Sequence, residues 1–151
     1  MSRWGRRFSL EVAGLPLAIG LVAGLHQTVG QADLQIKAIE VIPANGYLSV
    51  KVLIYSENGD NARNAALHLF LPVGARVARL SPGCLPSPSQ HDSAQARVDC
   101  ALGQIRVRDA REVIVVASPP APGIERRFAA FVYSDTPDPK VTNNYAERVL
   151  P

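Results

Sequence analysis

From residue 33 onward, apolar and polar residues alternate with a period of two, which is typical of strands with one buried face. The clearest run is Leu48–Ile54, in which every second side chain is apolar and Ser49 and Lys51 lie between them. No segment of this part repeats its apolar residues with a helical period over ten or more residues, so no helix is predicted. Strands are expected at 34–43, 48–54, 67–71, 77–80, 98–102, 113–117, 128–133 and 145–150.

Residues that favour turns separate these segments. Asn45-Gly46 predicts a tight hairpin turn, and the cluster Glu57–Asn61 predicts a second turn. Asp135–Pro139, followed by Asn143 and Asn144, predicts an ordered turn before the last strand, because proline cannot donate to a strand ladder. Seven or eight short strands with turns at even spacing predict an all-β fold, an immunoglobulin-like β-sandwich.

The start of the chain has the features of a cleavable signal peptide. The small residues Gly30 and Ala32 flank one larger residue and predict cleavage after Ala32. We therefore expect residues 1–32 to be removed on export and residues 33–151 to form one domain in the periplasm or outside the cell. This leader begins with the basic residues Arg3, Arg6 and Arg7. Its apolar stretch, Val12–Leu25, is too short and too rich in glycine to span a bilayer.

Removal of this leader changes the charge of the protein. The whole chain has 16 Lys and Arg against 13 Asp and Glu, and the leader holds three of the basic residues and one of the acidic ones. The remainder therefore carries a formal charge of +1, and the basic character of the chain comes mostly from its leader. No basic stripe with interleaved aromatic residues remains, which argues against nucleic acid as a partner.

The chain has two cysteines, Cys84 and Cys100. In an oxidising compartment this pair predicts a disulfide, with Cys100 on the core side of its strand. Two unpaired buried thiols are the alternative, and a metal site is disfavoured because no CxxC or HxxxH spacing accompanies the pair. Between them, Leu85–Gln95 is rich in Pro, Ser and Gln and is expected to be an exposed loop and a candidate contact surface.

Several motifs occur in an order that resembles a known family. They are Ala32-Asp33-Leu34, Asn58-Gly59 with Ala62 and Asn64, Leu71–Gly74, Ser81–Cys84, Val98–Gly103, and Asp135–Pro139 with Asn143-Asn144. Together they resemble the bacterial surface-repeat family catalogued as domain of unknown function eleven, whose members are immunoglobulin-like sandwiches. The resemblance implies a binding or structural module without catalytic residues. The chain departs from the family in lacking a proline after Gly59, in having strands rich in Arg rather than Thr, and in carrying a single copy.

Candidate metal ligands are few. His68 and His91 are the histidines outside the leader, with Asp92 and Asp99 as possible neighbours. Since no ligand spacing accompanies them, we expect solvated side chains, with His68 on the outward face of its strand.

A calcium site is the other possibility. Asp135, Asp138, Asn143 and Asn144 carry the carboxylate and amide oxygens that Ca²⁺ prefers. The alternative is that these side chains hydrogen-bond to nearby backbone amides and hold the turn.

The sequence contains no serine-nucleophile motif, and no pair of carboxylates points to glycoside chemistry, so neither an enzyme nor a cofactor is expected. It predicts a noncatalytic exported module with a structural, adhesive or protein-interaction role at the bacterial cell envelope or outside the cell. The partner would be a protein or cell-surface component, and no membrane span would remain after leader removal. The alternative is a secreted or periplasmic ligand- or Ca²⁺-binding protein that uses the turn at 135–144. Unpaired edge strands also favour association with a like domain or a donated strand.

Overall fold

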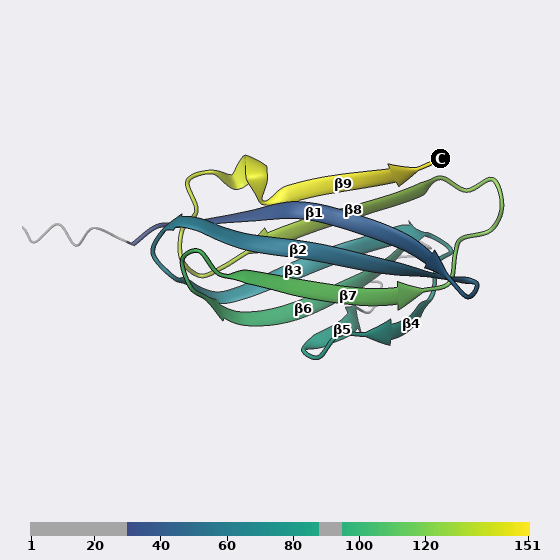
Figure 1. Cartoon of the computed structure of the whole chain (residues 1–151), viewed down its shortest axis with the longest axis horizontal. Helices are drawn as coiled ribbons and strands as arrows, with labels where there is room; N and C mark the ends of the chain where they lie inside the picture. The colour runs from purple at the N-terminus through teal and green to yellow at the C-terminus, as the bar shows by residue number, and fades with distance from the viewer. Residues whose placement is uncertain (1–29, 88–94) are drawn as a thin grey trace, which may run out of the picture.

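A computed structural model of the protein describes residues 30–87 and 95–151 (Figure 1). Most of the predicted leader therefore lies outside the described residues. The described part consists of nine strands and one short 3-10 turn, η1. Their bounds are β1 (Ala32–Ala44), β2 (Tyr47–Gly59), β3 (Ala62–Val73), β4 (Val77–Leu80), β5 (Cys84–Ser87), β6 (Gln95–Ile105), β7 (Ala110–Ala117), β8 (Arg126–Tyr133), η1 (Val141–Asn143) and β9 (Tyr145–Leu150).

The strands form two antiparallel sheets that pack face to face. One has the order β1-β2-β7-β4 and the other β5-β6-β3-β8-β9. In Figure 1, β9 lies beside β1 at one edge of the sandwich, and β4 and β5 lie at the opposite edge. The groupings β1-β2-β7 and β3-β8-β9 repeat the A-B-E and C-F-G pairings of immunoglobulin domains, so the predicted immunoglobulin-like sandwich is confirmed.

Alternation along the strands sends one set of side chains into the core. In β2, Val50, Val52 and Ile54 are fully buried, while Ser49 and Lys51 between them are partly exposed. The same alternation holds in the facing sheet, where the largest buried side chain is Phe128 of β8. The inward face predicted for β2 and the inward position predicted for Cys100 are therefore correct.

The two predicted turns at the ends of β2 are also confirmed. Asn45 and Gly46 both have positive φ, 50° and 80°, as a type I′ hairpin turn requires. At the other end, Gly59 has φ of 84°, and a Cβ on it would clash with the carbonyl oxygen of Gln31. Only glycine fits there, because the backbone before β1 passes directly over it.

One part of the sequence interpretation is wrong. The sequence predicts a loop over Leu85–Gln95, but Leu85, Pro86 and Ser87 belong to strand β5, and Gln95 begins β6. This ninth strand is one more than predicted. It tolerates Pro86 because β5 is an edge strand, on which one missing amide donor can face away from the ladder. Residues 88–94, including His91 and Asp92, lie outside the described residues.

The predicted cleavage point lies at the start of β1. The side chain of Ala32 is buried, its amide donates to the carbonyl oxygen of Pro137 at 2.9 Å, and Gly59 is its partner in the ladder. Cleavage after Ala32 stays a prediction, and it would have to precede folding, since the folded domain shields this bond. In the ranges 30–87 and 95–151, no helix is long and apolar enough to cross a membrane.

Candidate functional site

Two groups of polar side chains are the candidates for function: the turn that follows β8 and a network on the outer face of the five-stranded sheet. In the turn, Thr136 is buried, and its hydroxyl donates to the carbonyl oxygen of Asn61 and accepts from the amide of Arg63, both at 3.1 Å. The amide of Asp135 donates to the carbonyl oxygen of Arg63 at 2.9 Å. These bonds fix the turn against the start of β3, so the prediction of an ordered turn is confirmed.

The next residues of the turn fasten it to β1 of the other sheet. The carboxylate of Asp138 accepts from the amides of Leu34 and Lys140, each at 2.8 Å. The side chain of Lys140 in turn lies 2.6 Å from the buried carboxylate of Asp33, which also accepts from the Asn143 amide at 2.9 Å. The turn therefore joins the two sheets through residues more than 100 positions apart.

The charges of this cluster are matched. Burial raises the pKa of the Asp33 carboxyl, but the hydrogen bonds from Lys140 and Asn143 and the charge of Lys140 outweigh it, so the pKa lies below its usual value of 3.8. The same contact raises the pKa of Lys140 above its usual value of 10.5. Lys140 therefore neutralises the Asp33 carboxylate.

The four predicted calcium ligands do not share one set of contacts. Asp138 is hydrogen-bonded to backbone amides, Asp135 accepts from the side chain of Asn64 at 2.6 Å, and Asn143 donates to Asp33. The side chain of Asn144 is buried, and its amide oxygen has no partner among the described residues. Across residues 30–87 and 95–151, no three His, Cys, Asp or Glu side chains are grouped as a metal site would require. The calcium site stays a prediction.

The second candidate begins at the cysteine pair. Cys84 and Cys100 form a disulfide, as predicted, and are direct partners in the ladder between β5 and β6. Both are buried on the core side of their strands. Because successive side chains alternate between faces, the residues beside them, Leu85 and Asp99, point outward. The disulfide therefore fixes the edge strand that carries part of the outer face.

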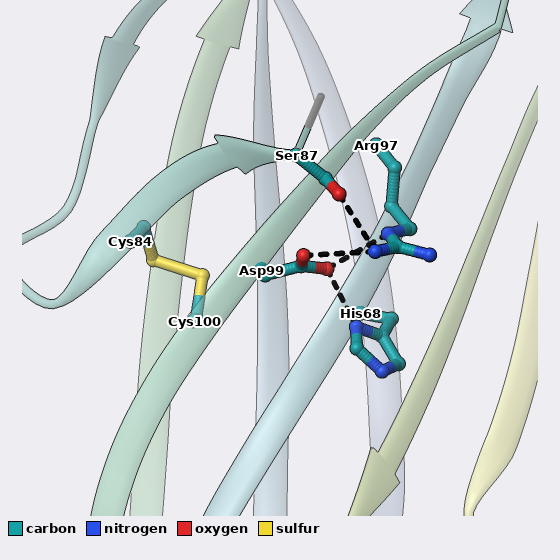
Figure 2. A network of polar contacts seen from close by, with 6 residues as sticks. All are labelled: His68, Cys84, Ser87, Arg97, Asp99 and Cys100. Atoms are coloured by element: carbon teal, nitrogen blue, oxygen red, sulfur yellow. Dashed lines mark hydrogen bonds and ion pairs between the residues drawn. A yellow bond between two sulfur atoms is a disulfide. The ribbon is translucent and has the colours of Figure 1, made fainter. Parts of the chain in front are cut away.

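Figure 2 shows the polar network on that outer face, next to the disulfide. The Asp99 carboxylate lies 2.6 Å from Nδ1 of His68 and accepts from Nη2 of Arg97 at 3.0 Å. The same Arg97 nitrogen donates to the hydroxyl of Ser87 at 2.6 Å. Burial raises the pKa of Asp99, but the bonds from Arg97, His68 and Ser87 outweigh it and lower the pKa below 3.8. A fixed, ionised carboxylate results.

The strand register extends this network into a row across the whole sheet. Leu85 pairs with Asp99, Asp99 with His68, His68 with Phe131, and Phe131 with Tyr145, one residue from each of the five strands. Leu85 and Tyr145, at the two ends of the row, have exposed fractions of 72% and 47%. We call this set the outer-face row.

Aromatic rings cover the middle of this face. The ring of Tyr133 lies 5.0 Å from that of His68 and 5.9 Å from that of Phe131, centroid to centroid. At the β9 end, the Tyr145 hydroxyl donates to Glu147, which also forms an ion pair with Arg127 at 2.9 Å. An aromatic centre therefore lies between two carboxylate–arginine pairs. The hydrogen bond to Glu147 raises the pKa of Tyr145 above its usual value of 10.0.

Sequence reasoning placed His68 correctly on the outward face but missed the row to which it belongs. The sequence predicts a solvated His68, but its imidazole bonds to Asp99. The sequence indicates Asp99 only as a possible metal ligand near His68 or His91. Alternation predicts that Asp99, His68, Phe131 and Tyr145 face outward; it does not predict that they align.

Comparisons with known proteins complete the description of the site. The chain matches no protein-family model and no curated protein. Among solved structures, an uncharacterised protein from Nocardia farcinica with an immunoglobulin-like fold is 17% identical, with a TM-score of 0.42 over 80% of this chain and 81% of that chain.

Two enzymes also show a similar course of the chain. AvmM, which catalyses macrocyclization in alchivemycin A biosynthesis, is 11% identical, with a TM-score of 0.39 over 77% of this chain and 86% of that chain. An inactive mutant of the GH20 exo-β-N-acetylglucosaminidase of Vibrio harveyi is 6% identical, with a TM-score of 0.37 over 81% of this chain and 17% of that chain. These likenesses concern the general arrangement of strands and imply no shared activity.

Proposed function

We propose that the chain is a noncatalytic exported module that contacts a protein or another component of the bacterial cell envelope, in a structural or adhesive role. Support for export comes from the leader-like residues 1–32 and from the Cys84–Cys100 disulfide, since disulfides persist in oxidising compartments. The sandwich gives such a module a rigid frame.

The observation that carries the interaction role is the outer-face row. Exposed aromatic and apolar side chains lie there beside carboxylates that are already paired with arginine. Interfaces are enriched in tyrosine, phenylalanine and arginine, and fixed side chains lose little conformational entropy when they bind. The row therefore has the composition and the order of a binding surface.

The geometry of the network supports a noncatalytic role. His68 and Asp99 resemble the base and orienting acid of a hydrolytic triad, but the hydroxyl of Ser87 accepts from Arg97 instead of bonding to the imidazole. A nucleophile needs such a bond to lose its proton. In the described residues, the network thus holds charges in place and lacks an activated hydroxyl.

Binding to isolated bacterial envelopes tests this function. We expect the exported, processed protein to co-sediment with them, and Leu85→Ala and Tyr145→Ala together to weaken retention by about tenfold, because exposed aromatic and apolar anchors dominate interface energies. Tyr47→Ala is the matched control, since Tyr47 is similarly exposed, at 45%, on the other sheet. Absence of envelope retention, or equal loss in the control, contradicts the proposal.

A second candidate is a ligand- or Ca²⁺-binding protein of the periplasm or medium that uses the turn at 135–144. The side-chain amide oxygens of Asn143 and Asn144, which have no hydrogen-bond partner within 30–87 and 95–151, favour it, while the Lys140 ammonium beside Asp33 competes with a cation there. Calorimetry with Ca²⁺ separates the candidates: binding heat and a raised melting temperature support this one, and the absence of both removes it.

A further inference from the structure

A hollow lies on the outer face of the five-stranded sheet, next to the outer-face row. Its volume is about 390 Å³, within the range of small-molecule sites. Ala101 pairs with Ala66, and Ala66 pairs with Tyr133, so small side chains lie between larger ones. The alanines form a low floor, and Leu85 and Tyr133 rise on opposite sides of it. His68, Ser87 and Asp99 also line it.

The hollow offers an aromatic surface that a saturated ring can cover. Tyr133 is 39% exposed, and its ring and that of His68 are inclined by only 35° at 5.0 Å. An aromatic face carries negative charge density and attracts the weakly positive C–H groups of a sugar ring. The tyrosine also loses little conformational freedom when a ligand covers it, because it has few rotatable bonds and neighbouring rings support it.

Polar atoms at one end of the hollow suit hydroxyl groups. With Nδ1 of His68 bonded to Asp99, no hydrogen bond among the described residues engages Nε2. The Asp99 carboxylate has an acceptor position beyond those used by His68, Arg97 and Ser87, and the Ser87 oxygen, which accepts from Arg97, can accept a second hydrogen bond. Sugar hydroxyls both donate and accept, so they can satisfy all three groups.

The charge of the hollow selects against ionic ligands. Asp99 is neutralised by Arg97, whose Nε lies 2.9 Å from the carboxylate, so a cation gains little there. An anion would be repelled by the Asp99 carboxylate, and Nη2 of Arg97 already donates to Asp99 and Ser87. An uncharged, hydroxyl-rich ligand meets neither penalty.

From these features we propose that the hollow bounded by Leu85, His68, Asp99 and Tyr133 is a binding site for an uncharged saccharide. The inference rests on the proposed function, because it names the class of envelope or matrix component that the module contacts. The sugar ring covers Tyr133 above the alanine floor, and its hydroxyls bond to Asp99, Nε2 of His68 and Ser87.

Titration of the exported, processed protein with uncharged tetrasaccharides of glucose and of N-acetylglucosamine tests the site, with tetragalacturonate as the charged comparison. We expect at least one uncharged tetrasaccharide to bind, tetragalacturonate to bind more weakly, and Tyr133→Ala to weaken binding by about tenfold, which corresponds to roughly 1.4 kcal/mol. Tyr47→Ala, on the other sheet, should bind as the unmodified protein does. Circular dichroism and melting curves show that both variants are folded.

The inference is overturned if none of the uncharged tetrasaccharides binds, if tetragalacturonate binds more tightly, or if Tyr133→Ala and Tyr47→Ala bind alike. Envelope retention distinguishes the two proposals. Retention without saccharide binding overturns the saccharide site and leaves the interaction module standing, whereas loss of both contradicts both.

Discussion

Replacing Cys84 and Cys100 together by alanine should lower the free energy of unfolding by about 3 kcal/mol. The disulfide joins residues separated by 16 positions, and a cross-link of that span stabilises mainly by restricting the unfolded chain. Alanine is the appropriate replacement because both side chains face the core, where a serine hydroxyl would be buried. Loss of the cross-link also frees β5 locally, since this edge strand pairs only with β6 among the described strands.

Chemical denaturation of the oxidised protein and the double variant measures this difference. Reductant provides the control: it should lower the stability of the unmodified protein towards that of the variant and leave the variant unchanged. Equal stabilities of the oxidised protein and the variant would show that the cross-link contributes nothing. Because β5 carries Leu85, the variant should also bind more weakly wherever the outer-face row is used.

Replacing Lys140 by methionine should lower the free energy of unfolding at neutral pH, since it leaves the buried Asp33 carboxylate without its cation. The loss is smaller than for a fully buried pair because Lys140 is more than half exposed and water screens it. Thermal and chemical denaturation of both proteins measure it. Lys51→Met is the matched control and should change little, because the carboxylate that loses its partner there, Glu40, is half exposed.

The pH dependence of the free energy of unfolding tests whether Asp33 is the partner of Lys140. Asp33 has a lowered pKa in the folded protein, so its contribution is complete above its usual value of 3.8 and is lost as the pH falls through the folded-state value. Lys140 has a raised pKa, so its contribution is complete below 10.5 and is lost as the pH rises through its folded-state value. The deficit of Lys140→Met should therefore be largest between these limits. In an Asp33→Asn background the same substitution should cost little, and a full deficit there contradicts the pairing.

The sequence predicted the sandwich well because its strands have one buried face. The alternation of Val50, Val52 and Ile54 with polar residues determines which side chains face inward, and the core follows from such runs. The turn at 135–139 was predicted as ordered because two prolines and two aspartates cannot extend a ladder. Strand β5 escaped prediction because Leu85, Pro86 and Ser87 show no alternation of apolar and polar residues; its place in the sheet comes from pairing with β6.

The candidate sites were less predictable because they depend on contacts between distant segments. Alternation predicts that His68 and Asp99 each face outward, but their 2.6 Å contact depends on the register of β3 and β6, which contains several irregularities. The ion pair of Asp33 with Lys140 joins residues 107 positions apart. No local pattern distinguishes it from two solvated charges.

Together, the disulfide and the turn at 135–144 explain how the outer-face row is kept in place. The disulfide holds the β5 edge, and the turn ties the β8–β9 end to β1 of the other sheet. The five strands that carry the row are thus fastened at both sides, which favours recognition by a preformed surface.

One experiment tests the central claim most directly: the protein is expressed in a bacterium with its own first 32 residues. Its location, its first residue and the number of its reactive thiols are then determined. If the protein is an exported sandwich cross-linked by one disulfide, it lies outside the cytoplasm and begins at Asp33. It then has no reactive thiol before reduction and two reactive thiols after reduction. An unprocessed chain that stays in the cytoplasm with two reactive thiols would contradict the account.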